Sequence, residues 1–356
     1  MKKHRILFLY AEVMGYVLEA LNHYQTIYND SEILVVELDN KKLTPYNFKS
    51  NNFQYIPISK FNSYKEFLNY CKLFNPTLLL TSGRKMNSFY FSASKYFKSK
   101  GVYTITLQDT QFENSLRQFL ISIFSKILYK SAFSGFWGSG SPQTSFAYRL
   151  GYNFSNIFDG FYVADETTYK KNYIFKPNKK NKTFVYVGRL SNEKNIQKLI
   201  DAISLLNSNS IHNHDLIIIG DGPLRSELKF DSNVKILGFK NSLEIKEISK
   251  DADAFCLPSN YEPWGVVVHE FAQMGFPLLC SNKCGAISSF LIDRFNGFTF
   301  DPSSTNSIVS ALSDFISLSD ASIEKMSENS FKLSKRYTYD TWSATLRSIL
   351  FKTIRR

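Results

Sequence analysis

The chain has 356 residues, of which 44% are hydrophobic and 21% charged, and this composition excludes an intrinsically disordered protein. Its formal net charge is +12, and residues 1–160 carry +8 of it. A basic surface suits nucleic acid, an anionic membrane or a phosphorylated substrate. Because no nucleic-acid motif accompanies the charge, we expect an anionic membrane or a phosphorylated substrate as partner and no nucleic acid.

No apolar run approaches the ~20 residues that cross a bilayer, and no cleavage site follows residues 6–10. We therefore expect a cytoplasmic protein, free or peripheral on the inner face of the membrane.

Short apolar runs alternate with longer segments of helical periodicity along the whole chain. Strands are expected at residues 6–10, 33–38, 53–58, 77–81, 103–107 and 135–138, with helices that include 64–74 and 88–98. A second series of strands is expected at 184–187, 216–219, 234–237, 254–257, 277–280 and 297–300. Alternation of this kind is typical of parallel sheets covered by helices, so two series predict an α/β chain with two Rossmann-like domains.

We place the domains at residues 1–165 and 166–338, and we expect the amphipathic helix within 339–356 to cross back to the first domain. Residues 170–182 contain six lysines and no acid, which predicts a solvated interdomain linker. The four cysteines lie in or near apolar runs without zinc-type spacing, so we interpret them as buried thiols.

The segment 112–133 mixes six large apolar residues with Arg117, Lys126 and Lys130. We expect a helix that packs into the core. The alternative, left open, is an interfacial helix that brings the protein to a membrane.

Polar residues follow two of the later strands, at the edge of a parallel sheet where ligands bind. After the strand 184–187 comes Gly188-Arg-Leu-Ser-Asn-Glu-Lys194, in which a glycine permits close approach and Arg189 and Lys194 bring two cations. Such cations suit a diphosphate. The next strand is followed by a tight turn, Gly220-Asp-Gly-Pro223.

The segment 257–280 reads as a strand, a loop, a helix and a further strand. Glu262 falls in the loop and Glu270 in the helix, with seven residues between them. The amides of Trp264, Gly265 and Val266 lie at the start of the helix, where backbone N–H groups favour anions and hydroxyls. Carboxylates beside these amides can accept hydrogen bonds from sugar or ribose hydroxyls.

This segment closely resembles the Glu-x7-Glu signature of the large retaining GT-B glycosyltransferases (glycosyltransferase family four), in its Glu-Pro-Trp-Gly version. Residues 188–194, 220–223, 237–239 and 253–259 match the same family in order and spacing, and a weaker similarity covers 135–165. The resemblance implies a GT-B fold, with two Rossmann-like domains and a donor cleft between them.

The resemblance also implies roles for individual residues. The catalytic residues would be Arg189 and Lys194, which stabilise the departing nucleotide diphosphate, and Glu262, which holds the transferred sugar. The donor-binding residues would be Gly188, Trp264, Gly265, Val266 and Glu270, the last of these on the ribose. Members of the family retain the anomeric configuration by same-face attack, and they need no metal and no cofactor.

The N-terminal half departs from the family pattern. Its first loop, residues 11–15, has Gly15 as its one glycine, and Gln108-Asp109 stands where the family often has a histidine. We take Glu12, Gly15, Gln108 and Asp109 as candidates for the acceptor side of the site.

The sequence thus predicts a hexosyl- or glycosyltransferase of bacterial surface polysaccharide or glycoconjugate assembly. Its partners would be a nucleotide-sugar donor, with a UDP-sugar favoured, a glycan or polyprenyl-diphosphate-linked acceptor, and an anionic membrane surface. Two alternatives stay open, a GT-B nucleotide-sugar epimerase and a non-catalytic sugar-binding subunit.

Overall fold

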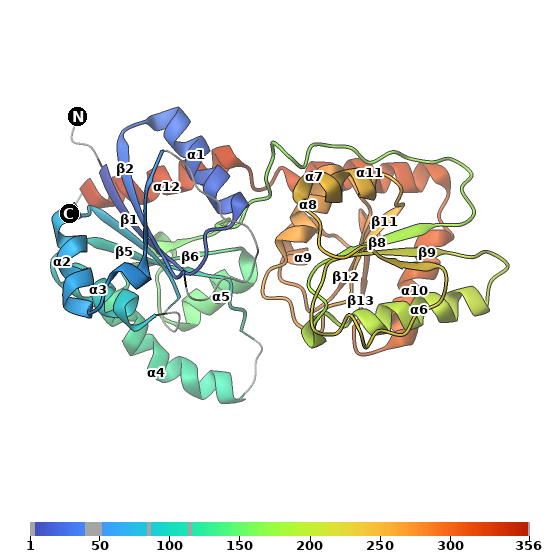
Figure 1. The fold of residues 1–356 in the computed structure, drawn as a ribbon, viewed down its shortest axis with the longest axis horizontal. Coiled ribbons are helices and arrows are strands. Elements are labelled where there is room, and N and C mark those ends of the chain that lie inside the picture. Colours follow the sequence, from blue (N-terminus) through green and yellow to red (C-terminus); the bar gives the residue numbers. More distant parts are fainter. Residues whose placement is uncertain (1–3, 40–51, 84–86, 113–115, 355–356) are drawn as a thin grey trace. The chain divides into compact units, whose positions relative to one another are not determined.

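A computed structural model describes residues 4–39, 52–83, 87–112 and 116–354. The chain divides into two units (Figure 1). The N-terminal unit comprises residues 1–163 and 339–356, and the C-terminal unit comprises residues 164–338.

The N-terminal unit is built on a parallel sheet in the order β3-β2-β1-β4-β5-β6-β7. Its strands are β1 (His4–Tyr10), β2 (Ser31–Glu37), β3 (Gln54–Pro57), β4 (Leu78–Ser82), β5 (Tyr103–Gln108), β6 (Gly135–Gly138) and β7 (Ile157–Phe158). Its helices are α1 (Gly15–Tyr28), α2 (Tyr64–Phe74), α3 (Ser88–Ser99), α4 (Leu116–Ala132), α5 (Ser141–Arg149) and α12 (Tyr339–Ile354).

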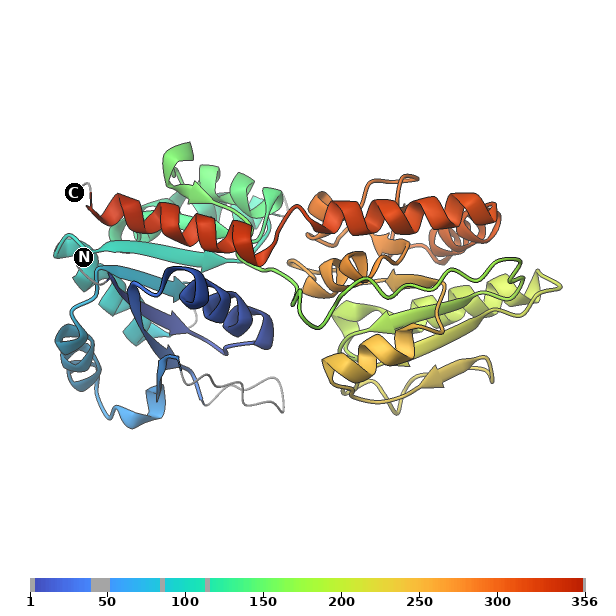
Figure 2. The ribbon, with the colours of Figure 1, turned by 90° about the horizontal axis from the view of Figure 1, so that it is seen from above.

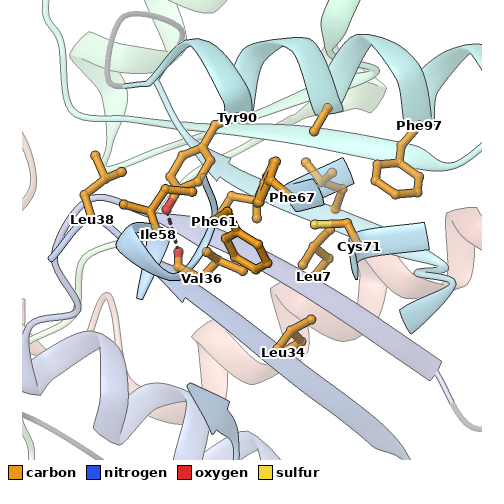
Figure 3. Close-up of a cluster of buried hydrophobic side chains, with 13 residues drawn as sticks. Leu7, Leu34, Val36, Leu38, Ile58, Phe61, Phe67, Cys71, Tyr90 and Phe97 are labelled. Carbon is orange, nitrogen blue, oxygen red and sulfur yellow. Dashed lines mark hydrogen bonds between the residues drawn. The ribbon is translucent and has the colours of Figure 1, made fainter. Parts of the chain in front are cut away.

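One face of this sheet forms a core with α2 and α3 (Figure 3). Phe67 and Cys71 of α2 are fully buried there against Leu7 and Leu34 of the central strands. The hydroxyl of Tyr90 on α3 donates to the carbonyl of Val36 at 2.8 Å, so its polar atom is satisfied inside an apolar cluster.

The last helix, α12, belongs to the N-terminal unit and packs against α1, as Figure 2 shows. Its Trp342 is 1% exposed, lies 5.0 Å from Trp137 between ring centroids, and donates its indole N–H to the carbonyl of Phe161 at 2.9 Å. An ion pair between Arg347 and Asp30 adds a polar contact to the same packing. Residues 339–356 therefore belong to the same domain as residues 1–163.

The C-terminal unit has a parallel sheet in the order β10-β9-β8-β11-β12-β13. Its strands are β8 (Thr183–Val187), β9 (Asp215–Ile219), β10 (Val234–Ile236), β11 (Ala254–Leu257), β12 (Leu278–Ser281) and β13 (Gly297–Phe300). Its helices are α6 (Ile196–Ser208), α7 (Ser242–Ser249), α8 (Val266–Met274), α9 (Ile287–Phe290), α10 (Thr305–Ile316) and α11 (Asp320–Ser334).

Both sheets agree with the expected architecture. Each of the twelve expected strands is present, and the prediction of an α/β chain with two Rossmann-like domains is confirmed. The two-residue strand β7 was not expected, because so short a run has no periodicity of its own. All four cysteines are buried free thiols, as interpreted from their apolar surroundings.

Residues 170–182, expected as a solvated interdomain linker, belong to the C-terminal unit, and most of them are exposed. Tyr173 packs edge-on against Phe276, and its backbone N–H donates to the carbonyl of Met274 at 3.0 Å. Lys179 forms an ion pair with Asp253 at 2.6 Å. The segment is thus attached to its unit at Tyr173 and Lys179, while Lys170, Lys171 and Lys180 stay exposed.

The prediction that α4 packs into the core is wrong for one side of the helix. Tyr129, Ala132 and Phe133 are buried, but Phe124 and Ile127 are each 72% exposed. Periodicity alone cannot tell which side of an apolar helix finds a partner, because that depends on which neighbouring elements cover it.

Candidate donor site

The candidate site lies where the strand order of the C-terminal sheet reverses. From β8 the chain moves to β9 and β10 on one side of the sheet, and β11, β12 and β13 follow on the other side. The loops after β8 and β11 therefore leave neighbouring strands in opposite directions and open a crevice at their carboxyl ends. Residues 188–195 and 258–265 form these two loops.

The turns that flank the site are held together by a close backbone approach at Gly220. A Cβ atom on Gly220 would lie 1.9 Å from the carbonyl oxygen of Gly188, and Gly220 has a φ of +148°. Gly188 in turn donates its N–H to Ile219 at 3.0 Å. Only glycine fits at position 220, so the Gly-Asp-Gly-Pro motif fixes the path of the loop that carries Arg189 and Lys194.

Lys194 ends a short 3-10 helix, Asn192–Lys194, and the next residue anchors it. Asn195 adopts a left-handed conformation, with a φ of 56°, and its side-chain amide donates to the carbonyls of Pro258 and Pro302 at 3.1 and 2.9 Å. This anchor directs the Lys194 ammonium to the carboxylate of Glu262, with which it forms an ion pair. The two side chains are 19% and 10% exposed.

The loop that carries Glu262 is fixed by backbone pairing with the loop after β12. Glu262 donates its N–H to the carbonyl of Lys283 at 3.2 Å and accepts from Gly285 at 3.0 Å. Gly265 then turns the chain into α8 with a φ of +90°, and a Cβ atom there would lie 2.9 Å from Cγ of Glu262. The glycine is therefore required both by its conformation and by the carboxylate beside it.

Trp264 and Val266 flank that glycine. The carbonyl of Trp264 accepts from Ala286 at 2.8 Å and from the thiol of Cys284 at 3.1 Å, while its ring is 2% exposed. Within the described residues, the buried indole N–H of Trp264 has no hydrogen-bond partner. Val266 is the first residue of α8. Because Gly265 has no side chain to cap this helix, the positive end of its dipole is available to a ligand.

Glu270 lies one turn into α8 and has different neighbours. Its carboxyl group is hydrogen-bonded to Tyr169 and lies near Asp165, both in the segment that begins the C-terminal unit. Burial, reinforced by the charge of Asp165, raises the pKa of Glu270 to about 8. A carboxyl group whose charged form is disfavoured in this way is typical of a functional site, where a ligand supplies the missing partner.

His269 fixes α8 to the two ends of the C-terminal unit. Its Nδ1 accepts from the N–H of Ala164 at 3.0 Å, and its Nε2 bonds the carbonyl of Ser334 at 2.9 Å. The ring is fully buried and stacks on Phe290 at 4.0 Å between centroids. Burial lowers the pKa of His269 to about 4, so the ring is a neutral structural group.

In the N-terminal unit the expected residues gather at the carboxyl ends of β1 and β5. The Gln108 amide donates to Thr106 at 2.8 Å and to the Tyr129 hydroxyl at 3.2 Å, so both amide hydrogens are used inside the unit. Asp109 lies near the Tyr10 hydroxyl and contributes to the rise of its pKa, which is caused mainly by burial.

The other N-terminal candidates lie in the first loop and at the start of the helix that follows it. Glu12 is in the loop after β1, and Gly15 is the first residue of α1. The Tyr10 hydroxyl, 3.1 Å from that of Tyr162, gives the same edge of the sheet a polar group that sequence reasoning missed.

Of the residues expected in the C-terminal site, Lys194 and Glu262 are in direct contact, and Gly265 touches Glu262. Arg189 is exposed in the same loop as Lys194. Sequence reasoning missed Tyr169 and Cys284, whose positions follow from contacts across the fold and have no local signal. Within the described residues, no cluster of three or more His, Cys, Asp or Glu side chains could hold a metal ion.

Comparison with known proteins gives matches to the same region. Residues 170–333 match the family model described as "Glycosyl transferases group 1". The chain is 33% identical over 134 residues to an uncharacterized glycosyltransferase of Methanocaldococcus jannaschii. The aligned region covers 36% of this chain and 34% of that protein. It is 32% identical over 138 residues to the UDP-Gal:alpha-D-GlcNAc-diphosphoundecaprenol alpha-1,3-galactosyltransferase of Escherichia coli, covering 36% of this chain and 35% of that protein. These matches span about a third of each relative's length.

A solved structure resembles the chain over nearly its whole length. Anabaena HepE, crystallised with UDP and glucose, superposes with a TM-score of 0.72 at 15% identity, over 98% of this chain and 100% of that one. At this identity the likeness concerns the fold. The match to the family model lies in the C-terminal unit, at residues 170–333, and the likeness to HepE extends the shared fold to both Rossmann-like domains.

Proposed function

We propose that the protein is a retaining, metal-independent glycosyltransferase of family four, which transfers a sugar from a nucleotide-sugar to a glycan or lipid-linked acceptor. The observation that carries the proposal is the Lys194–Glu262 ion pair at the point where the strand order reverses, beside the uncapped start of α8. This arrangement places a cation, a carboxylate and helix amides within one loop cluster, the groups needed for a diphosphate and a sugar.

In the proposed reaction the donor diphosphate takes the place of Glu262 as the partner of Lys194. Glu262, released from the ion pair, accepts hydrogen bonds from hydroxyls of the transferred sugar. The bond between the anomeric carbon and the diphosphate oxygen breaks, and the acceptor oxygen bonds to that carbon on the same face. The acceptor proton passes to the departing phosphate oxygen. Lys194 and Arg189 stabilise the negative charge that grows on the diphosphate.

The carboxyl group of Glu270 has the role of a ribose ligand in this proposal. It is held by Tyr169 at the start of the C-terminal unit, and two ribose hydroxyls can donate to its oxygens. We favour a UDP-sugar because HepE, which shares the fold, was crystallised with UDP and glucose.

For the acceptor we propose a glycan or a sugar on a polyprenyl diphosphate. The E. coli relative bears the name of an enzyme that acts on a diphosphoundecaprenol-linked sugar. We extend the proposal to the assembly of a surface polysaccharide or glycoconjugate on the cytoplasmic side. The candidates for acceptor contacts are Tyr10, Glu12, Gly15, Gln108 and Asp109.

The test is incubation with UDP-, GDP- and dTDP-sugars, with and without an undecaprenyl-diphosphate-linked sugar. Release of nucleotide only in the presence of acceptor supports transfer. Interconversion of the free donor without acceptor would indicate an epimerase, and binding without turnover would indicate a sugar-binding subunit. Proton NMR of the product decides whether the anomeric configuration is retained, and unchanged rates after dialysis against EDTA would support metal independence.

A further inference from the structure

The outer side of α4 presents large apolar side chains to solvent. Leu116 is 85% exposed, Phe119 51%, Ile123 52%, and Phe124 and Ile127 72% each. We call these five residues the α4 face. At helical spacing, 116, 119, 123 and 127 fall on one stripe, and 124 lies beside 127. A contiguous apolar patch of this kind marks an interaction site more often than a single exposed residue does.

The fold of the N-terminal unit does not need this face. α4 is held from its other side, where Tyr129, Ala132 and Phe133 join a core with Phe136 and Leu150. The helix also packs against α3, and Figure 1 shows it at the edge of the unit. The packing of the N-terminal unit therefore does not explain why the α4 face carries large apolar side chains.

Basic side chains border the α4 face. Lys126 and Lys130 are exposed on the same helix, which contains no acidic residue. Both lysines extend along the turn at Gly151, where a Cβ atom would lie 2.6 Å from Lys126 and 3.1 Å from Lys130. Phe154, three residues after Gly151 in the chain, is 79% exposed. The border of the face is thus basic, which is typical of helices that lie at a membrane surface.

We propose that the α4 face docks on an anionic lipid surface. Among the described residues, no helix is long and apolar enough to cross a membrane, so α4 would lie along the interface. A second copy of the chain fits the face less well, because two α4 faces in contact would bring four lysines together with no acid on either helix. An anionic membrane instead offers the lysines opposite charge and the apolar side chains a hydrocarbon boundary.

The experiment is co-sedimentation of the full chain with vesicles of phosphatidylcholine alone or mixed with phosphatidylglycerol. The chain should bind the mixed vesicles, and binding should weaken steeply between 0.1 and 0.5 M salt because surface charges are screened. Phe124→Ser/Ile127→Ser and, separately, Lys126→Glu/Lys130→Glu should each lower the affinity about tenfold or more.

Matched controls come from the same chain. Leu73 and Ile211 are 86% and 95% exposed, so Leu73→Ser/Ile211→Ser removes comparable exposed apolar side chains elsewhere, and this variant should bind like the wild type. Lys65 and Lys235, both exposed, give the corresponding charge control. All changed side chains are exposed, so the variants should fold, and circular dichroism checks this.

Three results would overturn the proposal. The wild type could fail to bind the mixed vesicles, or the α4 variants could bind as tightly as the controls. Sedimentation velocity provides the third: if Phe124→Ser/Ile127→Ser turned a dimer into a monomer with vesicle binding unchanged, the face would be a contact between copies. None of these readouts uses transfer activity, so a failure here is distinguishable from a failure of the proposed function.

Discussion

Lys194 and Glu262 form an ion pair in which both side chains are largely removed from solvent. Each charge therefore depends on the other for compensation, and removal of one leaves the other poorly solvated. In the proposed reaction the same lysine faces charge that grows on the diphosphate, so its interaction strengthens in the transition state. Replacement of Lys194 should therefore affect both stability and catalysis, and a second substitution at Glu262 can separate the two effects.

Lys194→Ala should lower kcat by about a hundredfold or more, equivalent to ~2.7 kcal/mol. It should also lower the melting temperature, because Glu262 loses its cation. Lys194→Ala/Glu262→Gln removes the unpaired charge and should recover melting temperature without recovering kcat. Steady-state kinetics and thermal denaturation measure the two effects. A Lys194→Ala enzyme with near-normal kcat would show that another residue stabilises the leaving group.

Glu270 should respond to pH through its raised pKa. Its carboxyl group titrates near pH 4.5 when unfolded and near pH 8 in the fold, so the free energy of unfolding falls as pH rises between these values. Glu270→Gln cannot ionise and should remove this fall, a difference of at least about 1 kcal/mol between pH 5 and pH 8.

Urea denaturation at several pH values measures the Glu270 effect. The same variant should bind the donor more weakly with a smaller fall in kcat, and Glu270→Ala should be more severe. Parallel stability curves for wild type and Glu270→Gln would show that the pKa is ordinary. Normal donor binding by Glu270→Ala would remove the ribose assignment.

At the scale of a single element, α8 shows how one helix serves structure and site together. Its first residue follows Gly265, its neutral His269 bonds both ends of the C-terminal unit, and Glu270 lies beside that histidine. His269 therefore fixes the helix in place, and the next residue, Glu270, supplies a carboxyl group to the candidate site.

The two loop glycines with similar φ values permit a matched comparison. Gly265 and Gly101 have φ of +90° and +82°, but a Cβ atom at 101 meets nothing within 4 Å, whereas at 265 it meets Glu262 and Cys284. Gly101→Ala and Gly265→Ala should both lose about 1 kcal/mol of stability from backbone strain. Only Gly265→Ala should also lower kcat/KM, by about tenfold or more. Equal activity in the two variants would contradict the placement of Glu262 in the site.

His269 should make the C-terminal unit sensitive to acid. Its pKa is about 4 in the fold and 6.5 when unfolded, so stability is complete above pH 6.5 and declines as pH falls towards 4. The loss amounts to about 3 kcal/mol at most. His269→Gln should flatten this part of the pH curve, while His214, whose pKa is also lowered by burial, keeps its own contribution in both proteins. An unchanged slope in the variant would mean that His269 is protonated normally.

At the scale of the whole molecule, the chain crosses between its two units twice, after residues 163 and 338. The second crossing returns α12 to the unit in which the chain starts, where Trp342 is buried against Trp137. The stability of the N-terminal unit therefore depends on residues 339–356, which follow the whole C-terminal unit in the sequence.

Trp342→Ala should destabilise the N-terminal unit by about 3–5 kcal/mol, because it opens a large cavity in a packed aromatic cluster. Hydrogen exchange followed by mass spectrometry should show faster exchange in β6, β7 and α1. Sheet strands β8 to β13 should keep their protection. A uniform loss over both units would contradict the assignment of α12 to one of them.

The sequence by itself determined the local features of this protein. Apolar runs of four to six residues marked twelve strands, and glycines with fixed spacing marked the turns at Gly220 and Gly265, because periodicity and backbone freedom are properties of short segments. The positions of Arg189, Lys194 and Glu262 after strand ends, and of Glu270 in the helix that follows, came from the same pattern.

Only the tertiary structure decided which of these residues meet. Lys194 and Glu262 are 68 residues apart and pair because β8 and β11 are neighbours in the sheet, while His269 bonds a residue 105 positions away. The same holds for burial: the composition of α4 predicts a core helix, but Phe124 and Ile127 are exposed, because burial is set by which element packs on which side. Contacts between distant segments depend on strand order and packing, and no local pattern encodes either.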